Sequence, residues 1–466
     1  MPTAAGKVSA PIRSIRAVPI PSVRADADAC PGALRLHAAA DGPLARVRVP
    51  GGRLTGAQLG TLRALAARWG DGCAELTSRA NLQLRGLREA PVAELAARLR
   101  AAGLLPSETH ELVRNIAASP LAGGLPLEAL DRALCADPSL AELPGRFLFA
   151  LDGGAGDVAF GADVAALPRG GETAIIFAGV DAGVRVPAAE VVQALLAAAH
   201  AFLAERAAQL ASPAPGAPVP PSAPAAAAFP VTDPDRPAAE HTGVAPSSAG
   251  VTHPRNDSAA GGRRVAWRVR ELTDGAARVA ARTAAALGRT PGEAVRLPRP
   301  GVREPIGIIE QPDGTVAVGA LVPLGRLSAV QLKVLEAAES VIVTPWRGVV
   351  LPGLSPQTAA AWATALAGAG LEVDPGSRWA GVTACAGRPG CAKSLADVRA
   401  DADAATVAGE GLPVHWVGCA RGCGSPAGPH VRVEATGTGY EVRSPCAGGA
   451  AAIGEVGALV GAARKG

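Results

Sequence analysis

Large side chains are scarce in this 466-residue sequence. It has one Met, one Tyr, six Trp and six Phe, and aromatic residues make up only 3% of the chain. The core must therefore consist mainly of Ala, Leu and Val, and a nucleic-acid surface built on base stacking is not expected. The net charge of +4 adds no basic footprint for a polyanion.

Lysine is also scarce, since only four of the 45 Lys and Arg residues are lysines. Ala, Gly, Pro and Arg are abundant together, which indicates a bias of nucleotide composition, so the abundance of arginine is not evidence of function. Hydrophobic residues at 48% and charged residues at 18% indicate a folded protein. The length allows about two to four domains.

Apolar runs of the kind that cross membranes or direct secretion are missing as well. The first thirty residues are interrupted by prolines, and the most apolar stretch, residues 188–210, contains Glu190, Glu205 and Arg206. We therefore expect a cytoplasmic protein without a membrane span. In a reducing compartment the eight cysteines are not expected to form disulfides, so clustered cysteines indicate a metal site or catalysis.

The chain contains an internal duplication. Residues 212–262 are dominated by Pro, Ala, Ser and Gly and predict a disordered linker. On either side of it, VPGGRLTGAQL at 49–59 matches VPLGRLSAVQL at 322–332, with seven of eleven positions identical. Each copy predicts strand, helix, strand, helix, and hence an α+β fold with two pseudo-symmetric halves.

The boundaries of these elements follow from local signals. A helix is expected to begin at an N-cap residue, a second strand to contain an arginine, and a second helix to end at a glycine. In the two copies these residues are Thr55 and Ser328, Arg79 and Arg347, and Gly103 and Gly370.

Four of the eight cysteines lie close together in the second half, as Cys385-x5-Cys391 and Cys419-x3-Cys423. This is not the Cys-x2-Cys spacing of a zinc ribbon, and the surrounding glycines leave backbone amides free to face sulfur. A [4Fe-4S] cluster held by four thiolates is the favoured interpretation, with zinc or four buried free cysteines as alternatives. The other four are interpreted as isolated structural residues: Cys30, Cys73, Cys135 and Cys446.

These cysteine pairs, the duplication, LTSRANLQLRGL at 76–87 and VRNIAASPLAG at 113–123 together resemble the sirohaem-dependent sulfite and nitrite reductase superfamily. The resemblance covers both halves and implies that each is a ferredoxin-like unit followed by a reductase-type α+β subdomain. The expected boundaries are 1–28 for a disordered tail, 29–110 and 111–211 for the first half, 212–262 for the linker, and 263–378 and 379–466 for the second half.

In that superfamily, basic residues of the first half hold the carboxylates of a tetrapyrrole and the second half carries the cluster. Carried over, Arg79 and Arg114 would meet propionate or acetate groups, with Arg85 and Arg146 as further candidates. Arginine suits this role because its planar fork pairs a carboxylate through two parallel hydrogen bonds.

One departure from the superfamily narrows the function. The reductases carry a Lys-x-Lys pair after Leu-Pro, whereas LPGRFLFALDG here keeps Arg146 and has Leu148 in place of the second lysine. The loss argues against reduction of a small oxyanion. CAGRPGC, GCARGCGSP and the opening CPGALRLHAAADGPLARVRVPGG resemble the precorrin-3B synthase branch, which serves aerobic cobalamin synthesis.

That resemblance implies a monooxygenase that inserts one atom of O2 at C20 of precorrin-3A and closes a γ-lactone. The implied cofactors are the cluster, which relays electrons from an NADH-linked donor, and a mononuclear non-haem iron. Among seven histidines, His110 and His415 are the nearest candidates for the iron, but no ligand set is legible. No GxGxxG motif follows a strand, so a separate reductase or ferredoxin is the expected donor.

Two other interpretations stay open. The first is a sirohaem-dependent sulfite or nitrite reductase, which would hold the tetrapyrrole as a cofactor instead of a substrate. The second is a non-enzymatic iron–sulfur electron-transfer protein, which would need no anion-lined cavity.

Overall fold

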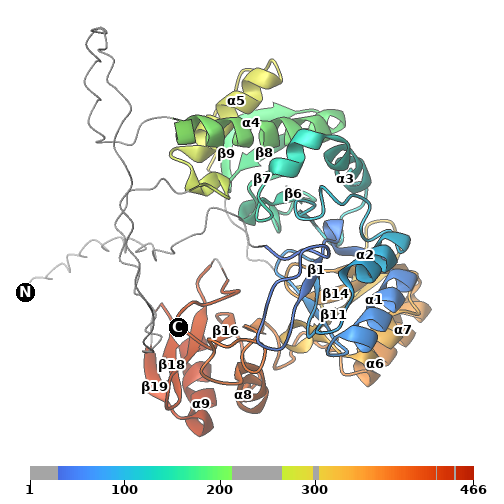
Figure 1. The fold of residues 1–466 in the computed structure, drawn as a ribbon, viewed down its shortest axis with the longest axis vertical. Coiled ribbons are helices and arrows are strands. Elements are labelled where there is room, and N and C mark those ends of the chain that lie inside the picture. Colours follow the sequence, from blue (N-terminus) through green and yellow to red (C-terminus); the bar gives the residue numbers. More distant parts are fainter. Residues whose placement is uncertain (1–29, 212–264, 297–303, 427, 446–447, 466) are drawn as a thin grey trace, which may run out of the picture.

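The computed structural model describes residues 30–211, 265–296, 304–426, 428–445 and 448–465 (Figure 1). The predicted tail, the predicted linker and Cys446 lie outside the described residues. Two ferredoxin-like units lie together on one side, and the two other subdomains lie apart from each other against them (Figure 1).

The ferredoxin-like units exchange strands. In the first sheet, β1 (Ala45–Val47), β4 (Leu82–Leu84) and β3 (Ala74–Leu76) are followed by β12 (Arg326–Leu327) from the second unit. In the second sheet, β10 (Gly307–Glu310), β11 (Val316–Leu321), β14 (Gly348–Leu354) and β13 (Ser340–Val343) are followed by β2 (Arg53–Thr55) from the first unit. The exchanged strands are the duplicated Arg-Leu segments, so the repeat itself joins the two halves.

The predicted helix starts and stops are confirmed. Thr55 and Ser328 cap α1 (Gly56–Trp69) and α6 (Ala329–Leu335), each through a reciprocal capping box with the glutamine three residues later. Such a cap contributes about 1 kcal/mol. The second helices, α2 (Val92–Ala101) and α7 (Pro356–Gly368), are each followed two residues later by a glycine, Gly103 at φ 72° or Gly370 at φ 79°, a left-handed conformation that glycine adopts without strain.

The expectation that Arg79 and Arg347 lie within strands is wrong, because both lie in turns. The hydroxyl of Thr77 accepts a hydrogen bond from the amide of Arg79, and the hydroxyl of Thr344 accepts one from the amide of Gly348. These bonds close the two turns. Leu76 pairs with Leu82 and Val343 with Val349. When the two copies are aligned on these strand pairs, Arg79 corresponds to Trp346 and Ala80 corresponds to Arg347.

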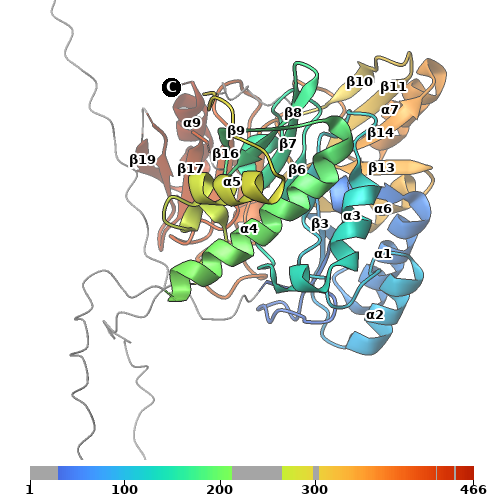
Figure 2. The same cartoon turned by 90° about the horizontal axis from the view of Figure 1, so that it is seen from above.

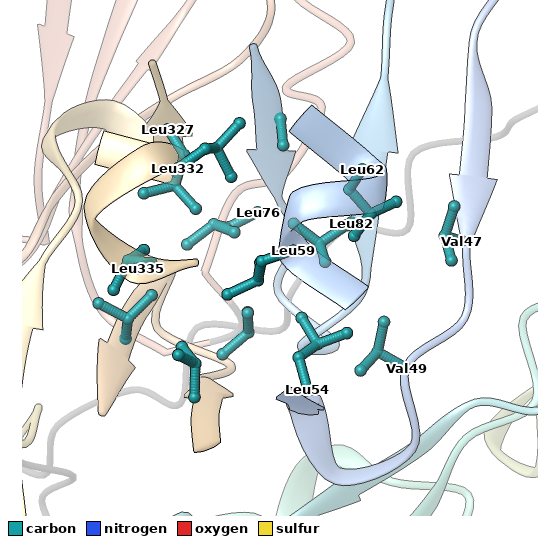
Figure 3. Close-up of a cluster of buried hydrophobic side chains, with 14 of the residues drawn as sticks. Val47, Val49, Leu54, Leu59, Leu62, Leu76, Leu82, Leu327, Leu332 and Leu335 are labelled. Atoms are coloured by element: carbon teal, nitrogen blue, oxygen red, sulfur yellow. The ribbon is translucent and has the colours of Figure 1, made fainter. Parts of the chain in front are cut away.

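A single aliphatic core spans both ferredoxin-like units. Helices α1 and α6 pack against each other, and leucines of both units point into the same cluster (Figure 3). Leu59, Leu62, Leu332 and Leu335 have no exposed surface. Burial of each such side chain contributes about 1.5–3 kcal/mol, so the exchanged arrangement is strongly favoured. The core lacks aromatic rings among its fully buried members, as the composition predicts.

The two remaining subdomains share one sheet plan. The first contains β5 (Ile116–Ala118), β6 (Phe149–Leu151), β7 (Val164–Arg169), β8 (Glu172–Phe177) and β9 (Val180–Val186), in that order. The second contains β15 (Val382–Ala384), β16 (Val414–Val417), β17 (Val431–Ala435), β18 (Tyr440–Arg443) and β19 (Gly448–Ala451). In each, the first three strands are parallel and the last two pairings are antiparallel.

The helices of these subdomains correspond as well. Helix α3 (Leu127–Ala136) connects the first two strands of one sheet and α8 (Val398–Ala405) those of the other, while α4 (Val191–Ala211) and α9 (Ile453–Arg464) follow the last strands. The predicted pair of pseudo-symmetric α+β halves is therefore confirmed.

Helix α4 and the short helix before it form a continuous apolar stretch. Residues 188–211 are the one helix in the described ranges that is long and apolar enough to cross a membrane by length and composition. In the fold, α4 packs on β7 and β8 and against α5 (Gly275–Ala286), as Figure 2 shows. Its buried Glu205 pairs with Arg278 and Arg282 of α5. The chain beyond residue 264 thus packs on the first subdomain before it enters the second ferredoxin-like unit.

Candidate iron–sulfur and tetrapyrrole site

The two cysteine pairs lie on loops at one edge of a sheet. Cys385 directly follows β15, and Cys419 follows β16, its parallel neighbour. The amide of Cys385 donates to the carbonyl of Trp416 at 2.9 Å, and the amide of Gly418 donates to Sγ of Cys385 at 3.3 Å. Because the ends of parallel strands meet at the same edge, both predicted pairs are brought together.

The other three clustered thiols act electrostatically on Cys423. Burial raises the pKa of Cys423, and the thiols of Cys385, Cys419 and Cys391 raise it further against the opposing effect of Arg421. Within the described part of the chain, however, no three His, Cys, Asp or Glu side chains stand close enough to hold a single metal ion. The thiols are neighbours on glycine-rich loops with one amide already directed at sulfur, and this donor set fits a [4Fe-4S] cluster.

The two histidines considered for a non-haem iron are engaged elsewhere. His415 is fully buried, its Nε2 donates to the carbonyl of Cys423 at 3.0 Å, and its Nδ1 lies 2.7 Å from the Thr383 hydroxyl. Burial, and then Arg347, lower the pKa of His415 to about 3, so the ring is neutral. His110 bonds the carbonyl of Asp137 at 2.9 Å and the Ser107 hydroxyl at 3.0 Å. The described residues therefore do not fit a mononuclear iron.

Two of the predicted tetrapyrrole-binding arginines already pair with carboxylates of the chain. Arg114 is buried, and its Nε and Nη2 contact the two oxygens of Asp131 at 2.8 and 2.7 Å. Arg85 forms the same fork with Asp41 at 2.8 and 3.0 Å and donates to the carbonyl of Gly390 at 2.8 Å. Arg85 thus fastens the loop between Cys385 and Cys391 to the first ferredoxin-like unit.

The other two predicted arginines have no carboxylate partner among the described residues. Nη1 of Arg79 donates to the carbonyl of Gly145 at 3.4 Å, and burial lowers the pKa of this arginine to about 10. Arg146 is exposed, with its guanidinium 4.8 Å from the ring centre of Trp267. Arg79 in particular keeps a guanidinium available for an anion in partly buried surroundings.

Leu148, which stands where the reductases carry a second lysine, lies in an apolar cluster. Its exposed fraction is 7%, and it packs with Ala117, Ala150 and Val158. The backbone amide of Leu148 donates to Asp163 at 2.9 Å, and Asp163 pairs with Arg268. Among the residues that the structure describes, the neighbours that pack with Leu148 are apolar, so no basic side chain takes the place of the missing lysine.

A further cavity in the described part of the chain lies elsewhere. Its volume is about 770 Å³, and it is lined by the loops after β5 and β6 together with Trp346 and Asp313, with no cysteine, arginine or lysine. This edge is the counterpart of the cysteine edge: the amide of Ser119 donates to Leu151, and that of Gly153 donates to the Ser119 hydroxyl at 2.8 Å. Sequence analysis missed this equivalence, although Ile-Ala-Ala-Ser before one loop and Val-Thr-Ala-Cys before the other could have indicated it.

Comparison with known proteins finds similarity to one family in the first ferredoxin-like unit. Residues 37–102 match the nitrite/sulfite reductase ferredoxin-like half domain. A ferredoxin–nitrite reductase of Leptolyngbya laminosa is 37% identical over 123 residues, or 23% of this chain and 24% of that protein. One from Synechococcus elongatus is 37% identical over 126 residues, or 24% and 25% of the two chains. The chain thus matches about a quarter of the length of these relatives.

The match in three dimensions is more extensive. The structure of the Mycobacterium tuberculosis NirA protein superposes with a TM-score of 0.63 over 89% of this chain and 79% of the other, at 19% sequence identity. The chain therefore shares its fold with the NirA protein.

Proposed function

We propose that this protein is an iron–sulfur oxidoreductase that acts on a polycarboxylated tetrapyrrole, and that its reaction is that of precorrin-3B synthase. The observation that carries the proposal is the combination of Arg79, a partly buried arginine that has no carboxylate partner in the described ranges, with an apolar residue at position 148. Such a site suits a large ring with carboxylate groups better than a small oxyanion, which needs converging positive charge.

The four cysteines would hold the cluster, which supplies single electrons when bound. In the proposed reaction, one atom of O2 enters at C20 of precorrin-3A and a ring acetate closes a γ-lactone. The other oxygen atom leaves as water after uptake of two electrons and two protons. Arg79 would orient the ring by pairing with one of its carboxylates.

The electrons would come from a separate NADH-linked reductase or ferredoxin. Arg388, Lys393 and Arg421 are exposed on the loops that carry the cysteines. This basic rim supports docking of an acidic donor protein close to the cluster, because charge complementarity accelerates association. Higher ionic strength should therefore slow electron delivery to the wild-type protein.

The second candidate is a sirohaem-dependent nitrite or sulfite reductase. It is favoured by the two relatives, which are both ferredoxin–nitrite reductases. This chain matches about a quarter of the length of each. In this case the tetrapyrrole would stay bound as a coloured cofactor through purification.

Isotope labelling separates the candidates. Anaerobically purified, reduced protein is supplied with precorrin-3A, an electron donor and 18O2, and the product is analysed by mass spectrometry. The synthase reaction adds one labelled oxygen. An unlabelled product, a sirohaem spectrum in the purified protein, or robust nitrite or sulfite reduction would reject the synthase in favour of the reductase.

Binding measurements test the role of Arg79. Replacement Arg79→Gln leaves a substrate carboxylate unpaired, which should weaken precorrin-3A binding by about 2–5 kcal/mol. The exposed Arg88 provides a matched control, and Arg88→Gln should bind as the wild type does. Equal affinity of Arg79→Gln and wild type would remove Arg79 from the site.

A further inference from the structure

Among the described residues, a second arginine without a carboxylate partner lies beside the cysteine loops. Arg347 is in the turn between β13 and β14, and within the described ranges its guanidinium forms no hydrogen bond or ion pair. It lies directly beside the second cysteine pair, since a Cβ placed on Gly424 would come within 2.9 Å of its Nη2. Neighbouring Gly424 therefore lets the guanidinium approach the loop of Cys423.

The position of Arg347 is unusual for an arginine. Its φ is 66°, a left-handed conformation that residues with a Cβ rarely adopt. The turn register matches it with Ala80 of the first unit, a small residue that is 1% exposed. The duplication therefore does not explain the arginine, because the same backbone turn forms with alanine.

The surroundings of Arg347 leave its charge uncompensated. Its electrostatic neighbours are Arg399, Glu75, Glu304 and Cys385. Arg399 and Glu75 already pair with each other, with Nη1 and Oε1 2.6 Å apart. Burial raises the pKa of Glu304 to about 7, so this carboxyl is only partly ionised. A positive charge thus faces the cysteine loops, and the described part of the chain supplies no fixed counter-ion for it.

We propose that Arg347 is a positioning residue for the cluster, whose fixed positive charge stabilises the more negative, reduced state and so raises the cluster's midpoint potential. The inference rests on the proposed iron–sulfur cluster. Four thiolates give the cluster a net negative charge that grows when an electron is added, and a partly buried cation at short range favours that state. The charge would thereby make electron acceptance from the donor easier.

The test is a redox titration of the full chain followed by electron paramagnetic resonance, without substrate. Replacement Arg347→Gln should lower the equilibrium constant for cluster reduction on the order of tenfold, equivalent to about 59 mV for a one-electron couple. Arg347→Lys, which keeps the charge, should recover most of this shift. Arg326→Gln is the control, because Arg326 lies in the same unit but is paired with Asp71 at 2.9 Å, and it should leave the midpoint unchanged.

Each outcome decides the proposal. An unchanged midpoint in Arg347→Gln with full iron content overturns it, and weaker tetrapyrrole binding in that case assigns Arg347 to substrate carboxylates instead. If Arg347→Gln loses iron while Arg347→Lys keeps it, the charge requirement is supported. Loss of iron in both variants indicates a requirement for shape and overturns the proposal. Absence of a cluster in the wild type would instead refute the proposed function.

Discussion

Arg85 should be a principal anchor between the cysteine loops and the first ferredoxin-like unit. Its side chain is 7% exposed and contacts both oxygens of Asp41 and the carbonyl of Gly390, which lies next to Cys391. Arg85→Met keeps most of the aliphatic stem but removes the charge and all three hydrogen bonds. The variant therefore tests the electrostatic contact with little change in packing.

The expected loss in the free energy of unfolding follows from the polar groups that lose Arg85 as their partner. Removing one partner of a fully buried ion pair costs about 3–5 kcal/mol. The side chain of Asp41 is 19% exposed, so water reduces that part to about 2 kcal/mol, and the carbonyl of Gly390 adds about 1 kcal/mol. Glu75 keeps its partner Arg399, so it adds little. We expect Arg85→Met to lower the free energy of unfolding by about 3 kcal/mol.

Denaturant unfolding followed by circular dichroism measures this change, and iron release to a chelator reports on the loop. Arg85→Met should unfold earlier and release iron faster. The control is Arg88→Met, an exposed neighbour that should stay within about 0.5 kcal/mol of the wild type. Unchanged stability together with weaker tetrapyrrole binding would refute the anchor and restore Arg85 as a substrate-binding residue.

Three further results are expected. Replacement of Cys419 by Ala should abolish or convert the cluster signal in electron paramagnetic resonance, whereas Cys73→Ala should leave it unchanged. Burial, and then Asp152, raise the pKa of Asp157 to about 6. The folded state therefore binds the proton of Asp157 more tightly than the unfolded state does. The stability of the wild-type protein should consequently fall as the pH rises from about 4 to about 6. Asp157→Asn should lose that slope and gain about 1 kcal/mol at pH 7 in thermal unfolding; an unchanged slope would contradict the assignment. Ser328→Ala should lower stability by about 1 kcal/mol in denaturant titration, and no loss would contradict the capping role.

Features governed by neighbouring residues could be predicted from the sequence. The N-caps at Thr55 and Ser328 and the stops at Gly103 and Gly370 depend on contacts within a few positions, and all four appear as expected. The two cysteine pairs come together because Cys385 follows β15 and Cys419 follows β16, and these two strands are parallel neighbours.

Features that depend on distant partners could not be predicted in the same way. The strand exchange pairs β2 with β13 and β12 with β3, and residues such as Leu54 and Val341 meet across almost 300 positions. Asp131 lies on α3, and nothing in its local sequence marks it as the partner of Arg114. A motif identified the arginines in the sequence, but the acidic residues that pair with their guanidinium groups could be identified only from the fold.

The duplication creates two equivalent sheet edges, and only one of them carries the clustered thiols. Ser119 and Cys385 make the same backbone bond to the neighbouring strand and accept the same amide, so the backbone does not distinguish them. The hydroxyl of Ser119 donates to Asp157, and Asp152 accepts four amides of the adjoining loop. Those amides are thereby committed to a carboxylate, and a hydroxyl is a poor ligand for iron–sulfur chemistry. The side chains at two loop ends, and not the fold, therefore determine which edge can bind a cluster.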